Sequence, residues 1–119
     1  MKKFLSYIGL MKNKLKVLGI IPARLAASRF PNKPLKKIIN LTMLEHVYER
    51  AKLAKNLDYL TIATCDKKIF NFSKKKNYNV IMTSKKHSRA LDRVYEASKK
   101  LTNKLKMNKK DLTICIQAD

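Results

Sequence analysis

The chain has 119 residues, enough for one small domain with a modest core, and its 45% hydrophobic content excludes wholesale disorder. It carries 28 basic and 8 acidic residues, for a net charge of +20, and its two glycines exclude a glycine-rich phosphate loop. Because lysine pairs spread the charge along the whole chain, we interpret it as a solvated surface, with a polyanion-binding site as the alternative.

The first segment, residues 1–16, begins with basic residues and contains a short apolar patch over residues 4–11. Further lysines follow the patch without a small-residue cleavage site, and no segment of the chain is long enough to span a bilayer. We therefore expect residues 1–16 to be a disordered extension, with Met11 as a second possible start, and the protein to be cytoplasmic without a membrane partner.

The first predicted strand, residues 17–22, is followed by a basic loop that contains prolines. Arg24 and Arg29 offer forked donors that suit phosphate oxygens. Lys33 adds a movable charge and Ser28 a hydroxyl group. From the residues alone, an anion-binding loop and an ordinary exposed loop of a basic protein are equally open.

Three helical patterns and three further apolar runs alternate along the rest of the chain. In chain order they are a helix over 42–55, a strand over 59–64, a helix over 66–76, a strand over 79–83, a helix over 88–105 and a strand over 112–117. Thr42 is a predicted N-cap with Glu45 as its capping-box partner. Asp66 is the predicted N-cap of the second helix, and Asn77 its stop.

All four runs are apolar on successive residues, which predicts strands that are buried on both faces. Strands that alternate with helices, with no hairpin signal, predict a three-layer α/β/α, Rossmann-like fold with a mainly parallel sheet. Ligands of such sheets bind beyond the carboxyl ends of the strands. Because the sequence stops at the end of the fourth strand, we expect a truncated domain. Cys65 and Cys115 have no Cys or His at metal-ligand spacing, so we interpret both as buried thiols in a reducing compartment.

Five segments carry a family resemblance. They are IPARLAASRFPNKPL (21–35), MLEHVYERA (43–51), IATCD (62–66), VIMTSKKHSRALDRVYEA (80–97) and ICIQAD (114–119). In this order and spacing they resemble the motifs of sugar-activating cytidylyltransferases, most of all the 3-deoxy-manno-octulosonate cytidylyltransferase (CMP-Kdo synthetase) family. The resemblance implies a nucleotide-diphospho-sugar transferase-like fold, with residues 17–119 as its N-terminal, nucleotide-binding part.

The resemblance also implies a reaction, in which CTP and the sugar acid 3-deoxy-manno-octulosonate (Kdo) give CMP-Kdo and pyrophosphate for lipopolysaccharide synthesis, with Mg²⁺ as cofactor. The implied catalytic residues are Arg24 and Lys33. The implied nucleotide-binding residues are Arg24, Ser28, Arg29, Lys33, Asp92, Arg93 and Gln117. Asp119 is the implied metal ligand. The full-length family is expected to form homodimers and to bind no nucleic acid, and we expect little activity from these 119 residues alone.

The sequence departs from the family motifs at several positions. Ala27 replaces a serine, Asn32 replaces a glycine and is expected to tolerate a left-handed conformation, and Arg89-Ala90-Leu91 replaces Ser-Gly-Thr. His87 has either a ligand-side or a loop-ordering role. Two alternatives remain: a cytidylyltransferase for another sugar acid, such as an acylneuraminate, and a non-catalytic, basic α/β protein that binds nucleic acid.

Overall fold

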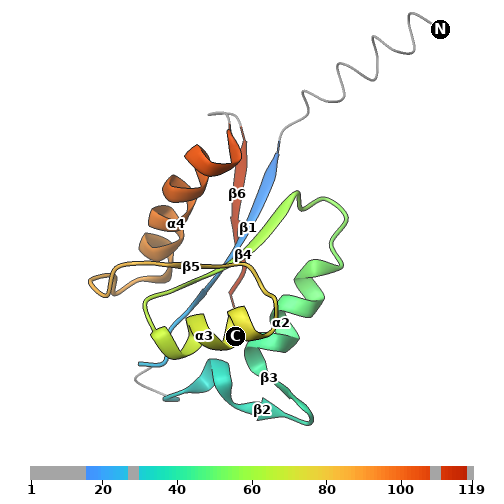
Figure 1. The fold of residues 1–119 in the computed structure, drawn as a ribbon, viewed down its shortest axis with the longest axis vertical. Helices are drawn as coiled ribbons and strands as arrows, with labels where there is room; N and C mark the ends of the chain where they lie inside the picture. Colours follow the sequence, from blue (N-terminus) through green and yellow to red (C-terminus); the bar gives the residue numbers. More distant parts are fainter. Residues whose placement is uncertain (1–15, 27–29, 108–110, 118–119) are drawn as a thin grey trace, which may run out of the picture.

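The computed structural model describes residues 16–26, 30–107 and 111–117. Within them, a four-stranded parallel sheet has the order β5-β4-β1-β6 (Figure 1). Its strands are β1 (Val17–Ala23), β4 (Tyr59–Thr64), β5 (Val80–Met82) and β6 (Leu112–Cys115). The parallel sheet is therefore confirmed.

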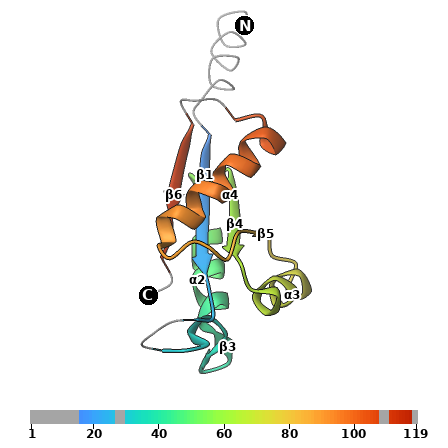
Figure 2. The ribbon, with the colours of Figure 1, turned by 90° about the vertical axis from the view of Figure 1, so that its left-hand side faces the viewer.

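The two faces of this sheet are covered by different helices. The helices are α2 (Met43–Lys52), α3 (Lys67–Lys75) and α4 (Ala90–Leu105). One core cluster joins Ile21 and Ile62 to residues of α2 and α3, and the other joins Leu18 and Ile20 to α4. Figure 2 shows α4 in front of the strands, with α2 behind them. The predicted three-layer α/β/α architecture is confirmed.

Burial differs between the central and the outer strands. In β1 and β4, Ile20, Ile21 and Ile62 are fully buried, as expected of strands with neighbours on both sides. In the outer strands, Met82 is 36% and Leu112 is 52% exposed. The prediction that all four strands are buried on both faces is wrong for β5 and β6, because each has one paired edge and partial helix cover among the described residues.

Helix α2 begins as predicted and ends earlier than predicted. The amide of Glu45 donates to Thr42 Oγ1 at 3.1 Å, and the amide of Thr42 donates to Glu45 Oε1 at 3.1 Å, which completes the capping box. Burial acts to raise the pKa of Glu45, but the hydrogen bonds from Thr42 together with Lys76 lower it overall. The helix ends at Lys52, three residues before the expected boundary.

A small hairpin lies between β1 and α2, where no hairpin was predicted. After a 3-10 turn, η1 (Lys33–Leu35), strands β2 (Lys37–Ile38) and β3 (Leu41–Thr42) pair antiparallel. The tip residue Ile39 has φ 64° and is 88% exposed, an unusual conformation for a β-branched side chain. The prediction failed because the tip lacks the glycine that normally marks such a turn.

Helix α3 follows Asp66 and stops before Asn77, whose left-handed φ of 61° ends the helix as expected. Asp66 is the N-cap residue of α3, as predicted, but its side chain makes no capping hydrogen bond. Cys65 and Cys115 are free thiols, partly rather than fully buried, and burial raises the pKa of Cys115. Among the helices of the described ranges, none has the length and apolarity needed to cross a membrane.

Candidate functional site

The carboxyl ends of the four parallel strands share one edge of the sheet, the end of the molecule where β2, β3 and α3 lie (Figure 1). The chain runs from β1 outward to β4 and β5, and then returns to place β6 on the other side of β1. This reversal puts a topological switch point between β1 and β6, where open α/β sheets bind ligands. Arg24 directly follows β1, Gln117 follows β6, and both are exposed.

The loop after β1 is closed at its base by the backbone of Leu25. The Leu25 amide donates to Asp66 Oδ2 at 2.8 Å, and its carbonyl accepts from the amide of Asn32 at 3.0 Å. Asn32 has φ 62°, which confirms the left-handed conformation expected there. Pro34, inside η1, is buried. The two ends of the basic segment therefore meet at one fixed residue beside β4.

The loop between β5 and α4 is held by Glu96, a residue of α4. Glu96 Oε1 lies 2.8 Å from His87 Nε2 and accepts from the amide of Ser84 at 2.9 Å. Glu96 Oε2 lies 2.8 Å from Lys100 Nζ, which also donates to the carbonyl of Met82 at 2.9 Å. The hydrogen bond from Lys100, followed by those from Ser84 and His87, outweighs burial and lowers the pKa of Glu96 to about 2. These contacts give His87 a loop-ordering role.

Arg93 is buried to 2% exposure and donates to atoms of the protein. Its Nε donates to Thr83 Oγ1 at 3.1 Å, and its Nη2 lies 3.5 Å from Cys65 Sγ and 3.4 Å from the carbonyl of His87. Arg93 thereby joins the carboxyl ends of β4 and β5. Its neighbour Asp92 pairs with Arg89 Nε at 3.1 Å in the first turn of α4.

The structure places five of the predicted nucleotide-site residues at this edge of the sheet: Arg24, Lys33, Asp92, Arg93 and Gln117. Ser28, Arg29 and Asp119 lie outside the described residues, as does the predicted extension up to residue 15. The nucleotide, catalytic and metal roles of all these residues stay predictions. In the described ranges, no group of three His, Cys, Asp or Glu side chains comes together to hold a metal ion.

Sequence reasoning missed the roles of two acidic residues at this edge. Asp66 follows a predicted strand and was interpreted only as a helix cap, so its hydrogen bond from the Leu25 amide was not foreseen. Glu96 was not singled out, because its partners lie up to twelve residues away across a loop. The roles of both residues could have been inferred only from their positions in the fold, because no local sequence pattern marks them.

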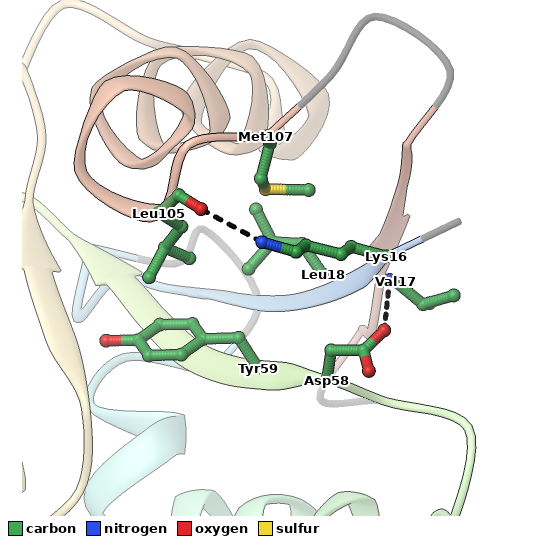
Figure 3. Close-up of a pocket in the computed structure, with 7 residues that line it drawn as sticks. All are labelled: Lys16, Val17, Leu18, Asp58, Tyr59, Leu105 and Met107. Atoms are coloured by element: carbon green, nitrogen blue, oxygen red, sulfur yellow. Dashed lines mark hydrogen bonds between the residues drawn. The ribbon is translucent and has the colours of Figure 1, made fainter. Parts of the chain in front are cut away.

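A small cavity of about 140 Å³ lies at the opposite edge of the sheet (Figure 3). Figure 3 shows Lys16 Nζ donating to the carbonyl of Leu105, at 3.3 Å, and the amide of Val17 donating to Asp58 Oδ2, at 2.7 Å. A cation at the carboxyl end of α4 complements the helix dipole. These contacts fasten the start of β1, far from the ligand edge.

Three comparisons place the chain among known proteins. A family model described as cytidylyltransferase matches residues 18–119. The mitochondrial 3-deoxy-manno-octulosonate cytidylyltransferase of Arabidopsis thaliana is 39% identical over 96% of this chain and 38% of its own length. The 8-amino-3,8-dideoxy-manno-octulosonate cytidylyltransferase of Shewanella frigidimarina is 42% identical over 88% of this chain and 41% of its own length.

Among solved structures, a CMP:2-keto-3-deoxy-manno-octonic acid synthetase complexed with CTP is similar, with a TM-score of 0.75 and 33% identity. That similarity covers 87% of this chain and 40% of the neighbour. The chain thus spans about two fifths of the length of these relatives. The match over residues 18–119, on a parallel sheet of the same fold, shows that the chain belongs to the cytidylyltransferase family.

Proposed function

We propose that the chain binds CTP at the carboxyl edge of its sheet and provides the nucleotide site of an enzyme that transfers CMP to 3-deoxy-manno-octulosonate. The observation that carries the proposal is the basic loop closed at Leu25, beside the switch point between β1 and β6. The likeness to a structure complexed with CTP, and to relatives named for this sugar acid, supports the same conclusion.

The loop suits a triphosphate because its base is fixed before a ligand arrives. Both backbone groups of Leu25 are bonded, and Asn32 holds the left-handed turn that the closure requires. Backbone groups that are held in advance lose less conformational entropy on binding. Arg24 stands exposed next to this fixed residue, with its guanidinium available to phosphate oxygens.

The reaction requires positive charge more than a nucleophile from the protein. The sugar hydroxyl oxygen bonds to the α-phosphorus of CTP and loses its proton, while the bond from that phosphorus to the bridging oxygen breaks and pyrophosphate leaves. Negative charge grows on the departing oxygens, and fixed cations lower the energy of that state. We assign this role to Arg24 and Lys33, with Arg29 of the same segment binding the phosphates.

The proposed metal ligand is Asp119, two residues beyond Gln117 in the sequence. Mg²⁺ in nucleotide enzymes is commonly bound through one or two carboxylates together with substrate phosphates. A single carboxylate that follows β6 fits an ion shared with the nucleotide in this way. When bound, the ion would neutralise phosphate charge and orient the α-phosphorus.

The identity of the sugar acid has two candidates. The similarity to a relative named for 8-amino-3,8-dideoxy-manno-octulosonate makes that sugar the second candidate. Arg89-Ala90-Leu91 departs from the family motif and lies at the start of α4, beside the ligand edge. We expect these residues to influence which of the two sugar acids is accepted. We place the reaction in the cytoplasm, where the two free thiols stay reduced.

Thermal melting tests the nucleotide assignment directly. CTP with Mg²⁺ should raise the melting temperature more than ATP, GTP or UTP, and Arg24→Ala should abolish the rise without changing the melting temperature of the free protein. Arg50→Ala removes the same charge from an exposed position on α2 and should leave the CTP effect intact. A steeply salt-dependent affinity for an oligonucleotide, with no CTP effect, would instead support nucleic-acid binding.

A further inference from the structure

The carboxylate of Asp66 has an unexpected partner. Asp66 occupies the N-cap position of α3, and its carbonyl accepts the amide of Phe70 at 3.0 Å, but its side chain makes no capping bond. Asp66 Oδ2 accepts the amide of Leu25 instead, at 2.8 Å and across 41 residues of sequence. The carboxylate therefore binds the backbone of the loop after β1 and does not cap its own helix.

Leu25 is held on three sides at the base of that loop. Its amide is held by Asp66, its carbonyl by Asn32, and its side chain packs against the core cluster of α2 and α3. Its sequence neighbour Arg24 is exposed. A change in the direction of the Leu25 peptide would move Arg24 and the start of the basic segment together.

Asp66 is itself held in place by its surroundings. Its amide donates to Thr64 Oγ1 at 3.1 Å, and the thiol of Cys65 lies 3.9 Å from Asp66 Oδ2. Arg93 Nη2 approaches the same sulfur at 3.5 Å. A chain of contacts thus links the ends of β1, β4 and β5, with Asp66 as the member that reaches the basic loop.

We infer that Asp66 is a positioning residue for the phosphate-binding loop, acting through the Leu25 amide. This inference rests on the proposed function, because it assigns the loop to CTP. Asp66 need not touch the nucleotide. Its charge-assisted hydrogen bond fixes the peptide that follows Arg24, so that this peptide is held in place before CTP arrives.

The structure offers a matched control at the other end of the same strand. Asp58 precedes β4 as Asp66 follows it, and Asp58 Oδ2 accepts the amide of Val17 at 2.7 Å, also across 41 residues (Figure 3). Asp58→Ala and Asp66→Ala therefore delete the same kind of bond from opposite ends of β1. Only Asp66→Ala alters the ligand edge.

The experiment measures CTP affinity of the full 119-residue chain by calorimetry with Mg²⁺, together with melting temperature and amide hydrogen exchange by NMR. We expect Asp66→Ala to weaken CTP binding at least tenfold and to speed exchange of the Leu25 amide. Asp58→Ala should lower the melting temperature similarly and change CTP affinity less than twofold. Asp66→Asn, which keeps an acceptor oxygen, should restore most of the affinity.

The outcomes separate this inference from the proposed function. Absence of CTP binding by the unsubstituted chain would overturn the proposed function. Normal CTP affinity in Asp66→Ala, or equal losses in Asp66→Ala and Asp58→Ala, would overturn the positioning role. If Asp66→Ala does not fold, amide hydrogen exchange in the unsubstituted chain still tests the positioning role. An unprotected Leu25 amide would contradict the hydrogen bond from Leu25 to Asp66 on which the inference depends.

Discussion

Replacing Glu96 by glutamine removes the charge that holds the β5–α4 loop. The carboxylate contacts Ser84, His87 and Lys100 at 2.8–2.9 Å. A fall in its pKa from the ordinary 4.5 to about 2 corresponds to about 3 kcal/mol, at about 1.4 kcal/mol for each pH unit. Since the Lys100 side chain is 51% exposed and screened by solvent, we expect Glu96→Gln to cost about 1–2 kcal/mol at pH 7, or about 4–8 °C in melting temperature.

The sign of the pH dependence follows from the lowered pKa. A carboxylate with a pKa lower in the folded than in the unfolded state stabilises the protein fully above about pH 4.5, and this contribution is lost as the pH falls toward 2. Urea unfolding at several pH values measures it. The difference in unfolding free energy between the unsubstituted chain and Glu96→Gln should shrink by more than half between pH 6 and pH 3.

A matched control is Glu49→Gln. Glu49 also accepts a side-chain hydrogen bond, from the hydroxyl of Tyr78 at 2.9 Å, but its side chain is 47% exposed. The control should cost less than about 0.5 kcal/mol. A Glu96→Gln cost that equals that of Glu49→Gln, or that stays constant down to pH 3, would refute the reasoning.

Two further substitutions test the fold. Ile39→Gly should raise the free energy of unfolding by roughly 1 kcal/mol, and with it the melting temperature, because glycine adopts the positive φ without strain and the exposed isoleucine contributes no burial. An unchanged or lower melting temperature would contradict the strained turn. Ile62→Ala, at a fully buried site of β4, should lower the free energy of unfolding measured in urea by about 2–5 kcal/mol. Ile114→Ala, on the outer strand β6, should lower it by less than half as much. Equal losses would contradict the assignment of β4 as a central strand and β6 as an outer strand.

Much of the fold could be predicted because it depends on local and repeating patterns. The apolar runs identified all four sheet strands, the pattern Thr42 to Glu45 identified a capping box, and Asn77 marked a helix end. The hairpin tip at Ile39 could not be predicted, since its conformation is imposed by the surrounding chain against local preference. The exposure of β6 depends on which helix covers which strand, and strand composition does not encode that.

The candidate site was predictable in its location and less so in its internal bonds. The topology rule for parallel sheets placed Arg24 and Gln117 at one edge, where the structure has them. The roles of Asp66 and Arg93 depend on contacts between residues 28 and 41 positions apart, which no short motif describes. A buried arginine whose donors face a thiol and a carbonyl can be recognised only once the ends of β4 and β5 lie together.

The most direct test of the central claim is an NMR titration of the ¹⁵N-labelled chain with CTP and Mg²⁺. The amides of Leu25, Ala26, Asn32 and Gln117 should shift and saturate with one dissociation constant, while those of Asp58 and Leu105, at the opposite edge, should not move. Shifts confined to that opposite edge, or no saturable shift at all, would contradict nucleotide binding at the carboxyl edge of the sheet.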